Sequence, residues 1–327
     1  MYRVALKNED DFAGWRKAAR ALALADIPPE QVEWQVGEGG DLFAGEGAGA
    51  APPDPPEGAE FSVPRQFMTL AEDAFAHPDK HRFEMLYELL LKVRATPRAI
   101  MDVGDPLVSR LSAMALEPRL EALEKRNDKD AALAELIVEA KDCKRCPLYK
   151  DATQTVFGEG AASARLMLMG EQPGDQEDLA GRPFVGPAGQ MLDRGLREAG
   201  IDRAETYVTN AVKHFRFEQR GPRRIHQKPD TSHIEACRWW FAQERVLVRP
   251  PVTVALGGSA AHALLGRKVT IGRTRGEPIP LKDGLEGWVT VHPSYLLRIP
   301  DKTKAEEEYG RFVEDLKGAR KRAKELA

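Results

Sequence analysis

The sequence predicts an α/β protein in which helices flank a parallel sheet, preceded by a mainly α-helical N-terminal region. From residue 143 onward, short apolar segments of strand length alternate with segments whose apolar residues recur at helical spacing. Before residue 141, the helical spacing predominates. Strand, crossover helix and strand repeated in this way make the strands parallel, with helices on both faces of the sheet. The expected strands are residues 165–169, 207–211, 252–256 and 288–291.

The N-terminal part, residues 1–140, is expected to form a mainly helical region. A stretch at 44–58 is rich in Gly, Ala and Pro, and because such a segment buries no core, we expect a linker or long loop there. Residues 141–327 are expected to form the α/β domain, which ends in a charged helix at 304–326. The helices expected in the first region are 11–25, 81–94, 107–116, 120–126 and 131–140.

Composition alone gives a weak indication of function. The chain has 327 residues, 42% of them apolar, so it can bury a sizeable core. A net charge of −3 does not by itself indicate nucleic acid. The charge is unevenly distributed, however, because residues 1–60 hold twelve acidic and five basic side chains, whereas residues 213–228 hold six basic side chains and one Glu. Since local charge decides whether phosphate is attracted, the second segment is the candidate for contact with a polyanion.

The chain has three cysteines, at positions 143, 146 and 237, and the first two form a C-x-x-C pair. An odd total argues against a disulfide framework. The polar residues 1–11 contain no apolar core of a signal peptide, and no run of about twenty apolar residues could span a bilayer. We therefore expect a cytoplasmic protein with no membrane partner, whose free thiols can hold a metal or a cluster.

Residues 170–189 carry the most informative motif, GEQPGDQEDLAGRPFVGPAG. Glycines and prolines directly after a strand indicate a rigid loop whose backbone approaches a ligand closely. A phosphate-binding turn or a plain surface loop is the alternative, although the four carboxylates of the segment would repel phosphate. The string resembles the first motif of the uracil-DNA glycosylase superfamily, most closely that of the family-four iron–sulfur enzymes and the UdgX proteins. The GEQPGD opening is the UdgX form.

This resemblance covers roughly residues 140–320 and implies the three-layer fold of that superfamily. The tripeptide His292-Pro293-Ser294 follows the last expected strand, and Arg298 comes after it as in the UdgX proteins. A lone His is more often structural or exposed, but the resemblance assigns His292 to uracil O2, where it stabilises the leaving anion. It also makes Arg298 a substrate-binding residue. Electrostatic help aimed at developing charge is usually the largest single contribution to catalysis.

Asn210 ends the expected strand YVTN, where it could simply cap a loop. Its amide offers one acceptor and two donors in a plane, which suits the N3 donor and O4 acceptor of uracil and would leave cytosine unpaired. Phe184, in RPFVGP, matches the ring on which the family stacks the flipped base, with a core Phe as the alternative. Gln172, within GEQPGD, is also expected to bind the substrate.

Three cysteines and one histidine form a candidate metal site: Cys143, Cys146, His214 and Cys237. A C-x-x-C pair suits zinc and an iron–sulfur cluster equally, and three Cys plus one His also make closed zinc sites. Family-four glycosylases hold a 4Fe–4S cluster with four cysteines. His214, in VKHF, stands where the third of these falls, a departure that the UdgX proteins share. The resemblance therefore favours a structural 4Fe–4S cluster, with zinc as the alternative.

The basic segment 216–229, RFEQRGPRRIHQKP, is expected to be a loop that contacts DNA phosphates, although charge runs are often only solvated surface. Its candidate phosphate-binding residues are Arg220, Arg223, Arg224 and Lys228. The string RRIHQKP resembles the Arg-rich insertion that separates the UdgX proteins from ordinary family-four enzymes. The resemblance assigns its His226 to attack on the sugar. It also implies that Glu171 stabilises the sugar cation and orients or deprotonates His226, while Asp175 helps to hold the loop.

The expected function is therefore recognition and excision of uracil from DNA, ending in covalent attachment of His226 to the abasic sugar. This is chemically reasonable because a well-placed neutral imidazole can trap an oxocarbenium-like sugar. The expected partner is uracil-containing DNA, preferably single-stranded, bound by a monomer during base-excision DNA repair. The alternatives are an ordinary multiple-turnover glycosylase that uses water, a non-catalytic iron–sulfur DNA-binding module, and a zinc-binding scaffold.

Overall fold

The computed structural model describes residues 1–37, 42–43, 51–59, 61, 63–76, 81–95 and 106–326. The chain divides into two compact units, Met1–Glu121 and Ala122–Ala327. Of the expected linker at 44–58, residues 44–50 lie outside the described residues, and residues 51–58 contain neither helix nor strand. The helix expected at 131–140 is observed as α5 (Lys129–Ala140) and belongs to the second unit.

The first unit is helical, as expected, but also contains two short strands that the sequence did not predict. Strands β1 (Tyr2–Leu6) and β2 (Val32–Val36) pair in parallel. Neither is a continuous apolar segment like those by which the other strands were predicted, because Arg3 lies within β1 and Glu33 within β2. An aromatic core forms around Trp15, whose ring centroid lies 5.5 Å from that of Phe75 and 6.3 Å from that of Trp34. The helices are α1 (Phe12–Leu24), α2 (Arg65–Phe75), α3 (Arg82–Ala95) and most of α4 (Pro106–Glu124), which joins the two helices expected at 107–116 and 120–126.

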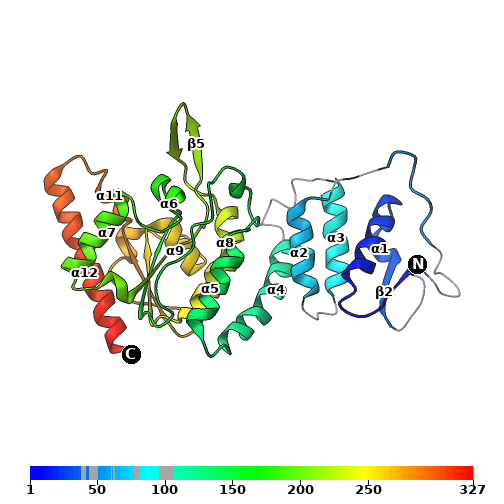
Figure 1. The fold of residues 1–327 in the computed structure, drawn as a ribbon, viewed down its shortest axis with the longest axis horizontal. Coiled ribbons are helices and arrows are strands. Elements are labelled where there is room, and N and C mark those ends of the chain that lie inside the picture. Colours follow the sequence, from blue (N-terminus) through cyan, green and yellow to red (C-terminus); the bar gives the residue numbers. More distant parts are fainter. Residues whose placement is uncertain are drawn as a thin grey trace. The chain divides into compact units, whose positions relative to one another are not determined.

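The second unit is built on a five-stranded sheet, which confirms the predicted α/β fold (Figure 1). Its order is β4-β3-β7-β9-β8, and the first four strands are parallel while β8 pairs antiparallel to β9 at the edge. The four parallel strands are fully or almost fully buried, as expected of a sheet covered on both faces. The strands are β3 (Leu166–Gly170), β4 (Thr206–Asn210), β7 (Val252–Leu256), β8 (Ile279–Pro280) and β9 (Glu286–Thr290).

Helices pack in two groups around this sheet. One group contains α7 (Pro187–Glu198), α11 (Pro293–Leu296) and α12 (Lys302–Glu325). These three helices contact one another, and α12 also packs on β3, β7 and β9. The other contains α9 (Gly258–Leu265), which packs on β3, β7 and β9, together with α8 (Thr231–Val248) and α5. The last helix, α12, buries the apolar side chains of Tyr309, Phe312, Val313 and Leu316.

The basic segment that we expected to be a loop is instead an antiparallel hairpin, and Figure 1 shows it projecting away from the sheet. Strands β5 (Phe217–Arg220) and β6 (Arg223–His226) are joined by Gly221 and Pro222. Gly221 has a φ of 57°, which suits the first central position of a two-residue hairpin turn. Gly-Pro between two short polar segments was the signal that the sequence-based prediction overlooked. None of the described helices is both long enough and apolar enough to cross a membrane.

Candidate functional site

The carboxyl ends of the parallel strands open into one cavity of about 1070 Å³, which is where ligands bind in sheets of this kind. Polar segments follow β3, β4, β7 and β9 at this edge. Every residue predicted to act in catalysis or to bind the base lines the cavity: Glu171, Gln172, Asp175, Phe184, Asn210, His226, His292 and Arg298. Lys228 lines it as well, whereas Arg220, Arg223 and Arg224 do not.

Asn210 lies at the end of β4 and is 2% exposed. Its Oδ1 atom is buried and has no hydrogen-bond partner among the described residues. A buried acceptor left unpaired is costly, so this atom is suited to a ligand that brings a donor. Gly170, at the end of β3, makes room for it, because a Cβ there would lie 2.4 Å from Asn210 Oδ1 and 2.5 Å from Phe184 Cζ.

Phe184 is held in a strained conformation beside Asn210. Its φ is 55°, a region that side chains other than Gly rarely adopt and that often marks a functional position. Gly189 allows the loop to close, because a Cβ there would lie 1.9 Å from the Phe184 carbonyl oxygen. Arg203 donates to that oxygen at 3.3 Å and forms an ion pair with Asp193 at 2.6 Å. These contacts hold the Phe184 ring as a fixed apolar surface within the cavity.

His292 follows β9, and its ring stacks on Phe184 with centroids 5.9 Å apart. Its Nδ1 accepts the Ser294 backbone N–H at 3.1 Å, so the proton of the neutral ring is on Nε2. Burial, with smaller electrostatic contributions from His226 and Arg298, lowers the pKa of His292 to about 4. At neutral pH His292 is therefore an uncharged hydrogen-bond donor.

Glu171 and His226 both line the cavity and lie next to each other. His226 Nε2 lies 3.6 Å from Glu171 Oε1, and the other carboxylate oxygen, Oε2, accepts the Ser259 hydroxyl. The His226 side chain is 49% exposed and that of Glu171 21%. Burial lowers the pKa of His226, while Glu171 opposes the shift. A neutral imidazole thus lies beside a carboxylate at the mouth of the cavity.

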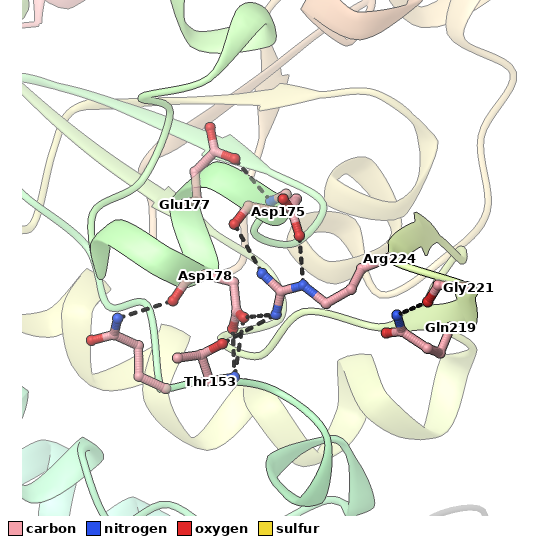
Figure 2. Close-up of polar contacts among 9 residues, drawn as sticks. Thr153, Asp175, Glu177, Asp178, Gln219, Gly221 and Arg224 are labelled. Carbon is pink, nitrogen blue, oxygen red and sulfur yellow. Dashed lines mark hydrogen bonds and ion pairs between the residues drawn. The ribbon is translucent and has the colours of Figure 1, made fainter.

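Arg224 joins the hairpin to the loop and helix that follow β3 (Figure 2). Figure 2 shows its guanidinium pointing toward Asp175 and Asp178 of α6 (Asp175–Ala180). Nε donates to Asp175 Oδ1 and Nη1 to Asp178 Oδ2, each at 2.6 Å, and Nη1 also donates to Thr153 Oγ1 at 3.1 Å. The Arg224 side chain is only 16% exposed, and two carboxylates already bind its guanidinium. Arg224 is therefore not available to bind phosphate, contrary to the prediction.

Gln172 fixes the base of the same hairpin. Its Oε1 accepts the Arg216 backbone N–H at 3.1 Å, and its Nε2 donates to the carbonyl oxygens of Arg216 at 3.1 Å and Gln227 at 3.0 Å. The amide therefore bonds both chain segments that enter the hairpin. Gln172 and Arg224 together place His226, which ends β6, at the cavity.

The other predicted phosphate ligands differ in how much of their charge is available. Arg220 is paired with Glu218 at 3.0 Å, in an exposed contact. Arg223 and Lys228 are exposed, and their side chains make no hydrogen bond or ion pair within the described part of the chain. These two residues therefore carry the most accessible positive charge of the segment.

The three cysteines lie together in the second unit and are buried. Cys146 and Cys237 are hydrogen-bonded. The bond and burial raise the pKa of Cys146, whereas the bond lowers the pKa of Cys237 against the opposing effect of burial. Cys143 Sγ accepts the Trp240 indole N–H at 3.1 Å, and burial raises its pKa to about 11. Cys237 Sγ accepts the Lys213 backbone N–H at 3.4 Å. His214 directly follows Lys213 in the chain.

His214, the fourth residue of the predicted metal site, is also buried. It is 3% exposed, its Nε2 lies 3.0 Å from Thr155 Oγ1, and its Nδ1 is buried without a hydrogen-bond partner among the described residues. Burial lowers its pKa to about 4, so the ring is neutral at neutral pH and one of its two nitrogens carries a free lone pair. This donor set fits the chemistry of an iron–sulfur cluster and of zinc alike. Across the residues that the structure describes, however, no three His, Cys, Asp or Glu side chains are arranged to hold a metal ion.

Several contacts in the site escaped the sequence-based prediction. The Ser259 hydroxyl donates a hydrogen bond to Glu171, and Arg203 donates one to the Phe184 carbonyl oxygen. Asp178 accepts one from Arg224. The residue types at these positions are common in loops and at helix ends, so only the Gly-Gly-Ser entry to α9 offered a local signal.

Comparison with known proteins identifies the family of the unit that holds this cavity. The family model of the uracil-DNA glycosylase superfamily matches residues 157–317. A type-4 uracil-DNA glycosylase of Thermotoga maritima is 40% identical over 168 residues, which are 51% of this chain and 84% of that protein. A type-4 uracil-DNA glycosylase of Pyrobaculum aerophilum is 37% identical over 167 residues, which are 49% and 82% of the two chains. The chain therefore belongs to the uracil-DNA glycosylase superfamily.

Proposed function

We propose that this protein excises uracil from DNA and stays covalently attached to the abasic sugar through His226. Excision is supported by relatives at up to 40% identity that are named type-4 uracil-DNA glycosylases. Attachment is supported mainly by one observation: His226 Nε2 lies 3.6 Å from Glu171 Oε1 at the mouth of the cavity. A nucleophile and a carboxylate so close together can act on the same sugar carbon.

Base recognition uses Asn210 and Phe184. The unpaired Oδ1 of Asn210 would accept the N3–H of uracil, while its amide nitrogen would donate to O4. Cytosine has an acceptor at N3 and a donor at its 4-position, so it would leave both groups unpaired. The strained Phe184 ring would stack on the flipped base. Gly170 keeps the two side chains close enough to contact one base.

In the cleavage step, the bond between C1′ and uracil N1 breaks, and its electron pair leaves with the uracil. The Nε2–H of His292 would donate to O2 and stabilise this anion, as a donor in a fixed position does without reorganisation. The sugar left behind is an oxocarbenium-like cation. The carboxylate of Glu171 would stabilise that cation, and Arg298 at the cavity rim would bind the substrate.

In the capture step, the lone pair of a His226 ring nitrogen forms the new bond to C1′. The imidazolium produced then loses its remaining ring proton to water, and the uracil anion gains one, so atoms and charge balance. The lowered pKa of His226 supports this role because only the neutral ring can attack. The second candidate is ordinary turnover, in which water attacks C1′ instead. It is favoured by the type-4 name of the relatives.

DNA binding is assigned to the hairpin and the cavity rim. Arg223 and Lys228 would contact phosphates, with Arg220 joining them if it exchanges Glu218 for a phosphate. Arg224 would act by placing the hairpin, since its guanidinium is bound to Asp175 and Asp178. We propose single-stranded DNA as the preferred substrate, because an unpaired uracil enters a cavity without the cost of breaking a base pair.

We further propose a 4Fe–4S cluster held by Cys143, Cys146, Cys237 and His214, with a structural role. When bound, it would supply cross-links between the segment before β3, the end of β4 and helix α8. Iron and sulfide analysis with a visible absorption spectrum distinguishes it from zinc, because a zinc protein is colourless.

The proposed function is tested on a denaturing gel with a labelled single-stranded oligonucleotide that contains one uracil. We expect a band of reduced mobility that survives heat and denaturant, formed in proportion to the enzyme added. A thymine oligonucleotide of the same sequence should give no such band. Free DNA that breaks in alkali, produced in excess over enzyme, would instead establish ordinary turnover. Intact DNA in every lane would reject both candidates in favour of a non-catalytic binding module.

A further inference from the structure

Ser259 bonds directly to Glu171, the carboxylate that the proposed mechanism places beside the sugar. It lies in the first turn of α9 and is 4% exposed. Its hydroxyl donates to Glu171 Oε2, while Oε1 faces His226 Nε2 at 3.6 Å. The two oxygens of one carboxylate therefore have different neighbours, one in the protein interior and one at the cavity.

The sheet brings this serine to its position. Strands β3 and β7 are neighbours with Met169 opposite Ala255, so the segments after them leave the sheet side by side. Gly257 has a φ of 90° and donates its N–H to the Thr290 carbonyl oxygen at 2.9 Å, which turns the chain sharply into α9. A Cβ on Gly257 would lie 3.0 Å from His292 Cβ, so this turn packs against the catalytic histidine.

We propose that Ser259 is a positioning residue that fixes the rotation of the Glu171 carboxylate, so that Oε1 faces the sugar and His226. A glutamate side chain has three rotatable bonds, and one strong hydrogen bond to a buried donor removes most of that freedom. The N-terminal end of α9 favours the negative charge as well. This inference rests on the proposed function, because it concerns what Glu171 does to the sugar cation and to its capture.

The position of Oε1 matters in two ways. A carboxylate displaced by about 1 Å stabilises the sugar cation less, which slows loss of uracil by up to about 100-fold. It also leaves the ring of His226 without the neighbour that aligns it, so water competes better for C1′. Removal of the Ser259 hydroxyl should therefore lower the rate and also shift the products from the covalent complex toward free abasic DNA.

The test compares Ser259→Ala with wild type and with Glu171→Gln, alone and combined, under single-turnover conditions with the uracil oligonucleotide. Uracil release and the fraction of covalent complex are measured separately. We expect Ser259→Ala to slow uracil release about tenfold in the wild-type background and less than about twofold in the Glu171→Gln background. Loss of the effect in the second background is what a role through Glu171 requires.

A matched control is Ser232→Ala, on α8. Ser232 also lies in the first turn of a helix, and its hydroxyl donates to Asp230 Oδ1 at 2.5 Å. It does not line the cavity. We expect this variant to keep wild-type uracil release. Thermal unfolding of each variant shows whether any loss reflects folding instead.

Three results would overturn the inference. Uracil release by Ser259→Ala could stay within about twofold of wild type, or fall equally in both backgrounds, which would indicate a merely structural serine. Thirdly, crystal structures of wild type and Ser259→Ala could show the Glu171 carboxylate in the same place, a result that needs no activity. Failure of the proposed function is distinguishable: if wild type releases uracil without forming a covalent complex, capture is rejected while the comparison of release rates still judges Ser259.

Discussion

The cavity at the sheet edge and the hairpin that reaches it are built in different ways. Asn210 ends a buried strand and His292 closely follows another, whereas Phe184 lies in the loop between α6 and α7, and close packing positions all three side chains. His226 ends a hairpin whose strands are mostly exposed, and polar contacts from Gln172 and Arg224 hold that hairpin.

This difference teaches that base excision and sugar capture can be separated. The sheet-edge residues are expected to support loss of uracil whatever attacks the sugar afterwards. In the proposed mechanism the hairpin supplies the nucleophile, His226, and the placement of the hairpin depends on a few polar contacts. Changes in the hairpin should therefore alter which product forms, whereas changes at the sheet edge should alter the rate of all products.

The largest expected effect is that of His226→Ala, which removes the proposed nucleophile and leaves the cavity floor intact. We expect the covalent complex to fall by at least about 100-fold while uracil is still released, because water can then reach C1′. The denaturing gel and an assay of free uracil measure the two outcomes. His262→Ala, a histidine on α9 that does not line the cavity, is the control. Continued cross-linking by His226→Ala would reject the capture proposal.

Gly170→Ala tests the sheet edge instead. A Cβ at this position would lie 2.4 Å from Asn210 Oδ1 and 2.5 Å from Phe184 Cζ, so both side chains that we propose to bind the base must move. We expect uracil release and covalent complex to fall together, by about 100-fold. Gly310→Ala on α12 is the matched control, since a Cβ there meets no atom within 4 Å. A loss of capture with normal uracil release would contradict the separation of the two regions.

Arg224→Met should have a smaller effect, restricted to the hairpin. It leaves the buried Asp178 carboxylate without its guanidinium partner, which we expect to lower the free energy of unfolding by about 1–3 kcal/mol. Displacement of His226 should lower the yield of covalent complex about tenfold. Arg220→Met removes an exposed arginine from the same hairpin and should leave stability nearly unchanged. Equal effects of the two variants on capture would indicate that Arg224 acts only through its charge.

The sequence predicted the sheet-edge region better than the hairpin, for a physical reason. The carboxyl ends of parallel strands meet at one edge, and Asn210 and His292 each stand at or just beyond the end of a predicted strand, so this rule and the family resemblance together placed them at the same edge. The contacts of Gln172 are of another kind, because its amide bonds backbone atoms of Arg216 and Gln227, and backbone atoms carry no sequence signal. The attachment by Gln172 was missed for that reason. Asp175 was expected to help hold this segment, but its partner Arg224 was assigned to phosphate instead, because nothing in the sequence indicates which side chains 46 or more residues apart will pair.

The smallest expected effect is a change of product with pH, and it compares the two histidines directly. Burial lowers the pKa of both, to about 4 for His292, while Glu171 opposes the lowering at His226. A lowered pKa keeps each ring neutral below the ordinary value of 6.5, so capture should persist at mildly acidic pH. On further acidification His226 gains a proton first and can no longer attack, whereas His292 still donates from Nε2. The ratio of covalent complex to released uracil, followed from about pH 8 to about pH 4, should therefore fall before uracil release does. A ratio that stays constant over this range would mean that no titrating nucleophile decides the product.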